Sequence, residues 1–142
     1  MKLAVDINVL VSGTLWKGNP ARLVDALLDG YATLCASAAM MTEFEEVIQR
    51  EKFKERLEQS GRGAHEIISR FRSAALIVEA PAIAVPAALR DPDDIHVLAC
   101  ATAAHADAIV TGDEDLLSMN TFAGIPILAV RQALEMIGIS PA

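Results

Sequence analysis

Short apolar segments alternate along the chain with segments whose apolar residues recur at helical spacing. Five apolar runs are predicted to be buried strands: the first residues of AVDINVLVSG, then ATLCA, ALIVE, AIVT and IPILAV. Between them, GNPARLVDALLDG and SAAMMTEFEEVIQR are typical of amphipathic helices, with Asn19 and Ser37 as the expected N-caps. Strands that alternate with helices predict an α/β fold, in which a mainly parallel sheet of about five strands is covered by helices on both faces.

The second half of the chain continues this pattern. Two helices are expected on either side of residues 60–63, and Asp91 and Pro92 are expected to open a further helix, DDIHVLACATAAH. A short helical turn around residues 116–119 and a last helix before Gly138 follow. With 142 residues and no internal repeat or low-complexity linker, the sequence predicts a single domain over residues 1–142.

The composition is that of a globular protein, with 53% hydrophobic and 22% charged residues. The longest uncharged runs, such as YATLCASAAMMT, are too short to span a membrane. Asp6 and Asn8 interrupt the first apolar run, which argues against a signal peptide and predicts a cytoplasmic protein. Cys35 and Cys100 lie inside apolar runs without CxxC spacing, which predicts buried, reduced thiols.

Asp6 lies in an apolar run where a buried strand is expected to be excluded from solvent. Burying an unpaired carboxylate costs on the order of several kcal/mol, so Asp6 is expected to face water at a strand end or to bind a cation. Asp113 follows the fourth predicted strand, and a doubly wound fold brings the ends of the first and fourth strands side by side. Two like charges about 4 Å apart repel by roughly 4 kcal/mol at an effective dielectric constant of about 20. Paired carboxylates at this edge therefore predict a bound cation.

Two further acidic residues lie on predicted helices. Glu43 is on the second helix, and Asp94 is near the start of the helix that Asp91 and Pro92 open. Taken singly, each acidic residue is typical of a cap, a turn or a favourable interaction with the helix dipole. Taken together, the acidic residues offer oxygen ligands with no Cys or His among them, and such a set favours Mg²⁺ or Mn²⁺ over zinc.

The charge is distributed unevenly. The net charge of −7 argues against a protein that coats nucleic acid electrostatically. Residues 50–72 nevertheless hold seven basic side chains against four acidic ones. Arg50, Lys52, Lys54 and Arg56 are candidates for steering an RNA backbone, and a solvated charged helix is the alternative interpretation. An aromatic content of 4% leaves few platforms for base stacking, which argues against RRM-like or OB-like readers.

The segments VDINVLVSG, EFEEVIQREKF, RDPDDIHVLACA and ADAIVTGDEDLL resemble, in order and spacing, the four acidic motifs of PIN-domain ribonucleases. The resemblance is closest to VapC-like toxins of type II toxin–antitoxin systems. It implies a three-layer α/β/α sandwich and hydrolysis of RNA phosphodiester bonds with Mg²⁺ or Mn²⁺. It also implies a homodimer that is bound by a small antitoxin protein. We expect the apolar faces of the early helices, including Leu23, Leu27 and Phe44, to form the surface between the two subunits of the dimer.

The resemblance also assigns residue roles. By position, the metal-binding and catalytic set comprises four residues: Asp6, Glu43, Asp94 and Asp113. Asp115 is implied as an auxiliary acidic residue, and Asn8 and Ser12 are implied as polar support that orients Asp6 or the attacking water. In DPDD, the position of Asp94 matches the family best, and Asp91 and Asp93 are the alternatives. Asp91 is expected to cap the helix, and Glu114 is expected to point outward.

Two other functions are compatible with acidic strand ends. A haloacid-dehalogenase-type phosphatase also uses Mg²⁺, but it needs D-x-D at the first strand and a later Lys. Here the first motif is DIN, and no Lys follows Lys54. The other alternative is a catalytically silent module that keeps the fold for binding a partner.

Overall fold

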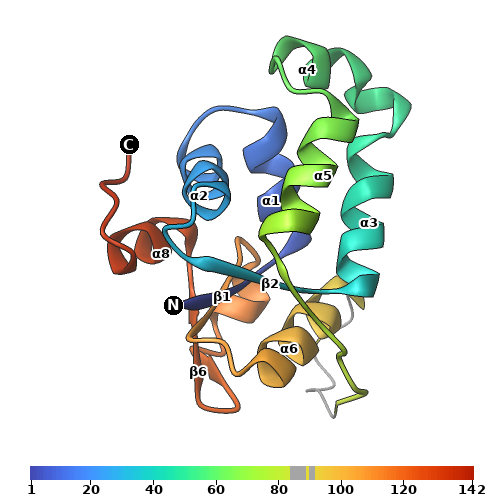
Figure 1. Cartoon of the computed structure of the whole chain (residues 1–142). Coiled ribbons are helices and arrows are strands. Elements are labelled where there is room, and N and C mark those ends of the chain that lie inside the picture. Colours follow the sequence, from blue (N-terminus) through green and yellow to red (C-terminus); the bar gives the residue numbers. More distant parts are fainter. Residues whose placement is uncertain (84–88, 90–91) are drawn as a thin grey trace.

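The computed structural model describes residues 1–83, 89 and 92–142, apart from the side chains of residues 92 and 93. Its centre is a six-stranded sheet with the strand order β3-β2-β1-β4-β6-β5. Figure 1 labels three of these strands, β1, β2 and β6. Five neighbouring strands run parallel: β3 (Leu76–Val78), β2 (Thr33–Ser37), β1 (Lys2–Val5), β4 (Ala108–Val110) and β6 (Ile125–Leu128). At one edge, β5 (Thr121–Phe122) pairs antiparallel with β6.

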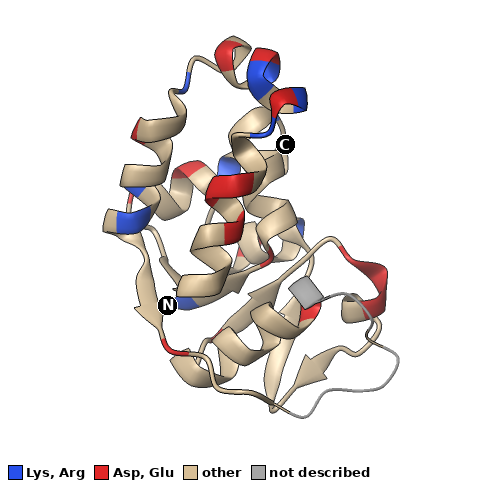
Figure 2. Cartoon of the chain, turned by 90° about the vertical axis from the view of Figure 1, so that its right-hand side faces the viewer, with Lys and Arg blue, Asp and Glu red and all other residues tan. Residues whose placement is uncertain are grey.

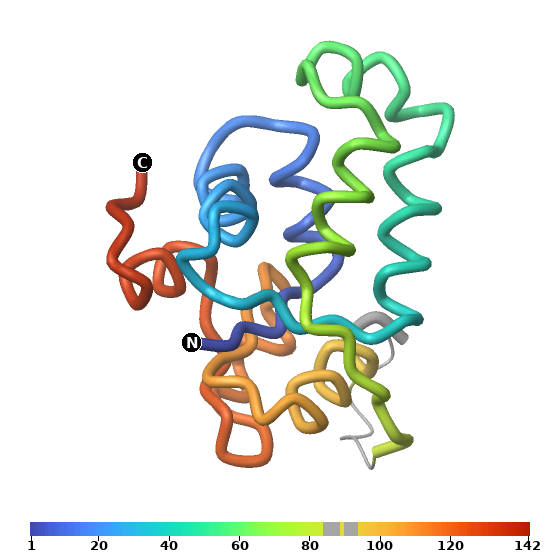
Figure 3. The backbone as a smooth tube through the Cα atoms, in the orientation of Figure 1, coloured from blue at the N-terminus to red at the C-terminus, as the bar shows by residue number. Residues whose placement is uncertain are grey.

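Helices cover both faces of this sheet. One face carries α1 (Ile7–Leu15), α2 (Asn19–Leu28), α3 (Ala38–Ile48) and α5 (Ala64–Ala74), and the other carries α6 (Pro92–Ala104), as the chain path in Figure 3 shows. The remaining helical segments are a 3₁₀ turn (Glu51–Phe53), α4 (Lys54–Gln59), α7 (Glu114–Leu117) and α8 (Val130–Met136). The α/β class and the three-layer sandwich predicted from the sequence are confirmed.

The first helix is the main element that the sequence pattern did not predict. α1 begins directly after β1, and all its residues except Asn8 and Ser12 are buried. A helix buried on nearly every side has no alternation of polar and apolar faces, so its apolar residues resemble the continuation of a strand. The other addition, β5, has only two residues and is too short to leave a pattern.

Two predicted N-caps have different outcomes. Ser37 caps α3, and its hydroxyl accepts a hydrogen bond from the backbone N–H of Met40, as expected. Asn19 was predicted to cap α2, but the N-cap is Gly18, whose φ of 120° suits glycine and is unfavourable for asparagine. The Asn19 side chain instead accepts a hydrogen bond from the N–H of Ala142 at 2.7 Å.

The core lies between the helices and the sheet. Phe44 and Phe71 pack edge to face there, with ring centroids 4.9 Å apart. Leu23, Leu27 and Phe44 are only 0%, 2% and 0% exposed. The prediction that these three form a dimer surface is therefore wrong. Apolar residues at helical spacing predict that a helix face is buried, but they do not show whether it packs inside the domain or against another subunit. Within the part of the chain that the structure describes, no helix is both long enough and apolar enough to cross a membrane.

Cys35 and Cys100 are both free and buried, as the sequence predicted. Burial raises the pKa of Cys35 above its ordinary range. Burial also raises the pKa of Cys100 to about 12, and the proximity of Cys35 contributes. Both thiols therefore stay protonated at neutral pH and are poor nucleophiles in the native fold.

Cys100 should make the folded protein less stable in alkali. An unfolded thiol releases its proton near pH ~8.5, whereas Cys100 in the fold retains its proton up to about pH 12. Between these values the unfolded state loses the proton first, so the free energy of unfolding should fall by up to ~1.4 kcal/mol per pH unit from this group. Denaturant titrations from pH 8 to 10 measure this slope. The slope should be shallower in Cys100→Ala, and equal slopes would contradict the prediction.

Candidate functional site

Asp6 occupies the turn between β1 and α1. It is the N-cap of α1, and its Oδ1 accepts a hydrogen bond from the backbone N–H of Asn8 at 3.1 Å. The backbone N–H of Asp6 donates to the carbonyl oxygen of Val110 at 2.9 Å, which ties this turn to the end of β4. The residue is only 2% exposed. The carboxylate that interrupts the first apolar run therefore begins a helix at the carboxyl end of a central strand.

Asp113 has the same role one strand away. It is the N-cap of α7, and its Oδ1 accepts a hydrogen bond from the N–H of Asp115 at 2.8 Å. β1 and β4 are parallel neighbours, with Val5 opposite Val110. The predicted meeting of the first and fourth strand ends is thus observed, and each strand is followed by an aspartate that caps the next helix.

Thr111 connects the two aspartates. Its hydroxyl donates to Oδ2 of Asp6 at 2.9 Å and accepts from the backbone N–H of Asp113 at 3.0 Å. Thr111 is completely buried. Thr111 is not among the residues predicted for the site, because a neutral hydroxyl after a strand carries no charge signal. The available clue was its place between the apolar run AIV and the dipeptide Gly112–Asp113.

The two aspartates line one open pocket of about 400 Å³. Asn8 and Ser12, both predicted as polar support, line the same pocket from α1. Val9, Pro20, Gly112 and Val130 complete the lining. Asp115 is exposed beside the pocket, where its N–H bonds to Asp113, and Glu114 is exposed, as expected. The pocket therefore gathers carboxylate, amide and hydroxyl oxygens at the carboxyl ends of neighbouring strands.

Glu43 and Asp94 lie on two helices, α3 and α6. Glu43 is partly exposed on α3, and Asp94 is 3% exposed in the first turn of α6. α3 packs against both α1 and α6, but neither acidic residue is among the residues that line the pocket. Among the described residues, no three His, Cys, Asp or Glu side chains form a group that could hold a metal ion. Asp91 and the side chain of Asp93 lie outside the described residues, so the choice among the three aspartates of DPDD stays a prediction.

The donor set of the pocket suits a hard divalent cation. Mg²⁺ commonly binds through one or two carboxylates and completes its shell with water and substrate phosphates. Asp6 and Asp113 supply two carboxylates, and the pocket offers the Asn8 amide and the Ser12 hydroxyl as further oxygen donors. Among the described residues, those that line the pocket include no Cys or His, and such a set of oxygen donors disfavours zinc.

The basic residues lie mainly on the helical layer, around α4 and α5 (Figure 2). Arg56 was predicted either to steer RNA or to sit on a solvated helix, but it also makes a tertiary contact. Its Nε donates to the carbonyl oxygen of Leu15 at 2.7 Å, and its guanidinium lies 5.9 Å from the ring centroid of Trp16. Lys52 lies 5.0 Å from the ring centroid of Phe53. This end of the molecule therefore combines cations with aromatic rings.

The comparisons with known proteins agree with this architecture. A family model described as the PIN domain matches residues 2–115. The match extends from β1 to α7, so it includes both aspartates of the pocket, Thr111, and the helices that carry Glu43 and Asp94. Among curated proteins, none matches the chain.

Proposed function

The chain belongs to the PIN-domain family, whose members are generally metal-dependent nucleases, and on that premise we propose that it is an endoribonuclease using Mg²⁺ or Mn²⁺. We further propose that it is the VapC-like toxin of a type II toxin–antitoxin system. The observation that carries the catalytic proposal is the pocket that Asp6, Asp113, Asn8 and Ser12 share at the ends of β1 and β4. The order and spacing of the four acidic motifs support the choice of RNA and of the toxin class.

Each pocket residue has a role in this proposal. Asp6 and Asp113 would hold the cation, and their second function as helix N-caps fixes their positions. Hydrogen bonds from Asn8 N–H and Thr111 Oγ1 reach both oxygens of Asp6, which keeps that carboxylate in one orientation. Ser12 and the side chain of Asn8 would orient the scissile phosphate or the attacking water.

A bound Mg²⁺ or Mn²⁺ would supply the chemistry that these side chains lack, by acidifying a water and offsetting charge on the phosphate. Glu43 and Asp94 remain proposed members of the catalytic set, with Asp115 as an auxiliary residue. Arg50, Lys52, Lys54 and Arg56 are proposed to contact RNA.

A homodimer and an antitoxin partner are also part of this proposal. Because Leu23, Leu27 and Phe44 are buried, any dimer must use other surfaces. A pocket lined by two carboxylates would attract an Arg or Lys side chain from an antitoxin, which would block the substrate. Light scattering of the chain alone, and with the product of a neighbouring short reading frame, tests both assemblies.

The function is tested by incubating the protein with RNA and, separately, with a generic phosphomonoester. We expect cleavage of RNA with Mg²⁺ or Mn²⁺, none in EDTA, and no turnover of the monoester. Turnover of the monoester alone would favour the phosphatase alternative. Absence of both activities under all metal conditions would favour the silent binding module. Mapping cleavage sites on total cellular RNA would then identify the target.

Thr111→Val should weaken both the fold and the activity. Valine keeps the shape of threonine but leaves Oδ2 of Asp6 and the N–H of Asp113 without this partner. Loss of a buried hydrogen bond of this kind costs about 2 kcal/mol, and loss of a group that orients a metal ligand costs about 10- to 100-fold in activity. Denaturant unfolding and RNA cleavage measure the two effects. Thr111→Ser keeps the hydroxyl and should retain most of both, and equal losses in the two variants would contradict this role.

A further inference from the structure

α1 presents a single stripe of exposed positions to solvent. Asn8 and Ser12 are its only residues that are not buried, and the C-cap, Trp16, follows at the same spacing of four residues and is 44% exposed. Residues four apart lie on the same side of a helix. Because Asn8 and Ser12 line the pocket of Asp6 and Asp113, the stripe leads from that pocket to Trp16.

Trp16 is held in place by the segment that follows α3. The ring of Phe53 meets the ring of Trp16 edge to face, with the centroids 5.9 Å apart. The guanidinium of Arg56 lies over Trp16, and the ammonium of Lys52 lies over Phe53. We call Trp16, Phe53, Lys52 and Arg56 the Trp16 platform.

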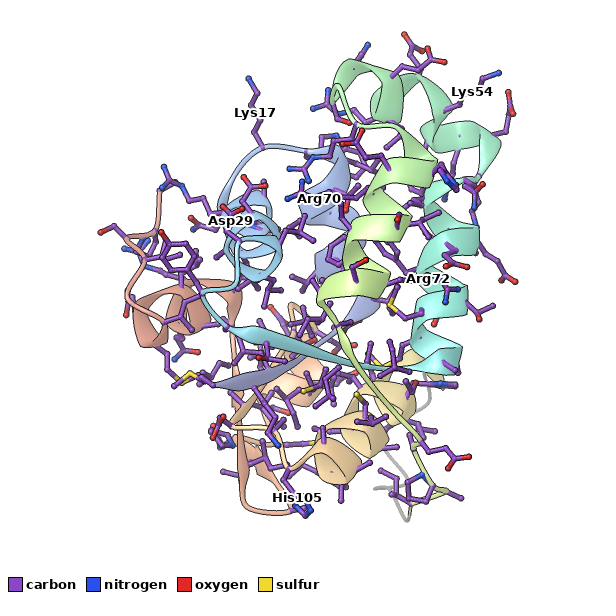
Figure 4. The ribbon with its side chains drawn as sticks, viewed as in Figure 1. Lys17, Asp29, Lys54, Arg70, Arg72 and His105 are labelled. Carbon is purple, nitrogen blue, oxygen red and sulfur yellow. The ribbon has the colours of Figure 1, made fainter. Side chains whose placement is uncertain are left out.

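The charge around this platform is locally positive. Residues 50–56 hold four basic side chains, at positions 50, 52, 54 and 56, and two acidic ones, Glu51 and Glu55. Figure 4 shows Lys17, from the α1–α2 connection, and Lys54, from α4, extending into solvent at this end of the molecule. An exposed indole with cations beside it suits a base together with its flanking phosphates.

We propose that the Trp16 platform is a stacking subsite for one base of a single-stranded RNA whose scissile phosphate lies at Asp6 and Asp113. The inference rests on the proposed nuclease function and names a substrate class and a specificity residue for it. At the helical rise of ~1.5 Å per residue, Trp16 lies about 15 Å beyond Asp6 along α1. At the ~3.4 Å rise of a stacked strand, the stacked base is about four nucleotides from the cleaved bond. Only an unpaired strand can offer a base in this way.

Trp16 is the only tryptophan of the chain, so its fluorescence reports this subsite directly. The protein used is the Asp113→Asn variant in Mg²⁺, in which hydrolysis is expected to be about 10³-fold slower. It is titrated with a short single-stranded RNA. We expect saturable quenching, much weaker quenching by an abasic strand of the same length, and little response to a duplex. A flat titration, as expected if a partner protein covers Trp16 instead, would overturn the proposal. Equal quenching by the abasic strand would also overturn it.

Kinetics provide a second, independent test. Stacking energies of ~1–3 kcal/mol per base correspond to a rise in KM of about 5- to 150-fold for Trp16→Ala, with kcat little changed. Trp16→Phe should keep most of the affinity. Tyr31→Ala is the matched control, because Tyr31 is another exposed aromatic residue, 64% exposed and distant in sequence from the platform. Equal KM values for Trp16→Ala and the control, or a loss confined to kcat, would count against the subsite.

The two tests separate this inference from the proposed nuclease function. The fluorescence titration measures binding and does not require cleavage. Quenching of the variant, together with no RNA cleavage by the wild type, would therefore support the subsite and refute the nuclease activity. In a cleaving enzyme, an abasic nucleotide scanned along the RNA should raise KM most at about four nucleotides from the cleaved bond. Cleavage that is indifferent to abasic substitution at every position would support the activity and refute the subsite.

Discussion

Asp113→Asn is expected to reduce metal-dependent RNA cleavage about 10³-fold while the fold is retained. Removing one charged group that acts on the transition state typically costs about 10²- to 10³-fold. Asparagine can still accept the hydrogen bond from the N–H of Asp115, so the N-cap of α7 is preserved and only the charge is lost. Single-turnover cleavage with saturating Mg²⁺ measures the rate, and circular dichroism confirms the fold.

The same variant separates a metal ligand from a structural cap. For the wild type, free Mg²⁺ or Mn²⁺ at about 100 times the Kd should add roughly 2.7 kcal/mol to the free energy of unfolding, a rise in Tm of about 2 to 8 °C. Asp113→Asn should be as stable as the wild type without metal and should lose most of this response. Glu114→Gln is the matched control, since Glu114 is an exposed acidic residue in the same turn, and it should behave as wild type. If Asp113→Asn destabilised the metal-free protein by more than ~1 kcal/mol and kept the metal response, Asp113 would be a cap alone.

The positions of Asp6 and Asp113 could be predicted because topology alone brings them together. Alternating strands and helices indicate a parallel sheet, and the ends of its central strands meet at one edge. Glu43 and Asp94 are different, since their places on α3 and α6 depend on how two helices pack, and sequence spacing does not give that. The described residues that line the pocket include both strand-end aspartates, and the convergence of Glu43 and Asp94 with them stays a prediction.

Other features left too little signal in the sequence. α1 was missed because its burial on nearly all sides removes the amphipathic pattern. Thr111 was missed because its importance comes from two hydrogen bonds that no local pattern reveals. One joins it to Asp6, 105 positions earlier in the chain, and the other joins it to Asp113, two positions later. Trp16 was counted among few aromatic residues, and only the fold places it beside Phe53 and Arg56. Residues that act through tertiary contacts are thus the ones that sequence reasoning misses here.

Gly13 lies where α1 closely approaches α2, the two helices that border the pocket. A Cβ added there would lie 2.3 Å from the carbonyl oxygen of Pro20 and 2.5 Å from Cγ2 of Val24. The Val24 side chain can rotate, but the Pro20 carbonyl is backbone, so α2 must move away from α1. Overpacking of this kind costs about 1–3 kcal/mol, and more where backbone must shift. We expect Gly13→Ala to lower the free energy of unfolding by about 3 kcal/mol.

The displacement should reach the pocket, because Pro20 on α2 and both Asn8 and Ser12 on α1 line it. RNA cleavage by folded Gly13→Ala should therefore fall as well, at temperatures where circular dichroism shows the variant to be native. Gly63→Ala is the matched control, since a Cβ there meets only the Glu66 Cβ at 4.0 Å and the glycine does not need a positive φ. This control should change the free energy of unfolding by less than ~1 kcal/mol. Alanine is a weaker N-cap than glycine, which destabilises the fold, but it also makes the unfolded chain less flexible, which offsets that loss. If the two alanine variants were equally stable and equally active, α1 and α2 would not be locked together at Gly13, and the pocket would owe its shape to other contacts.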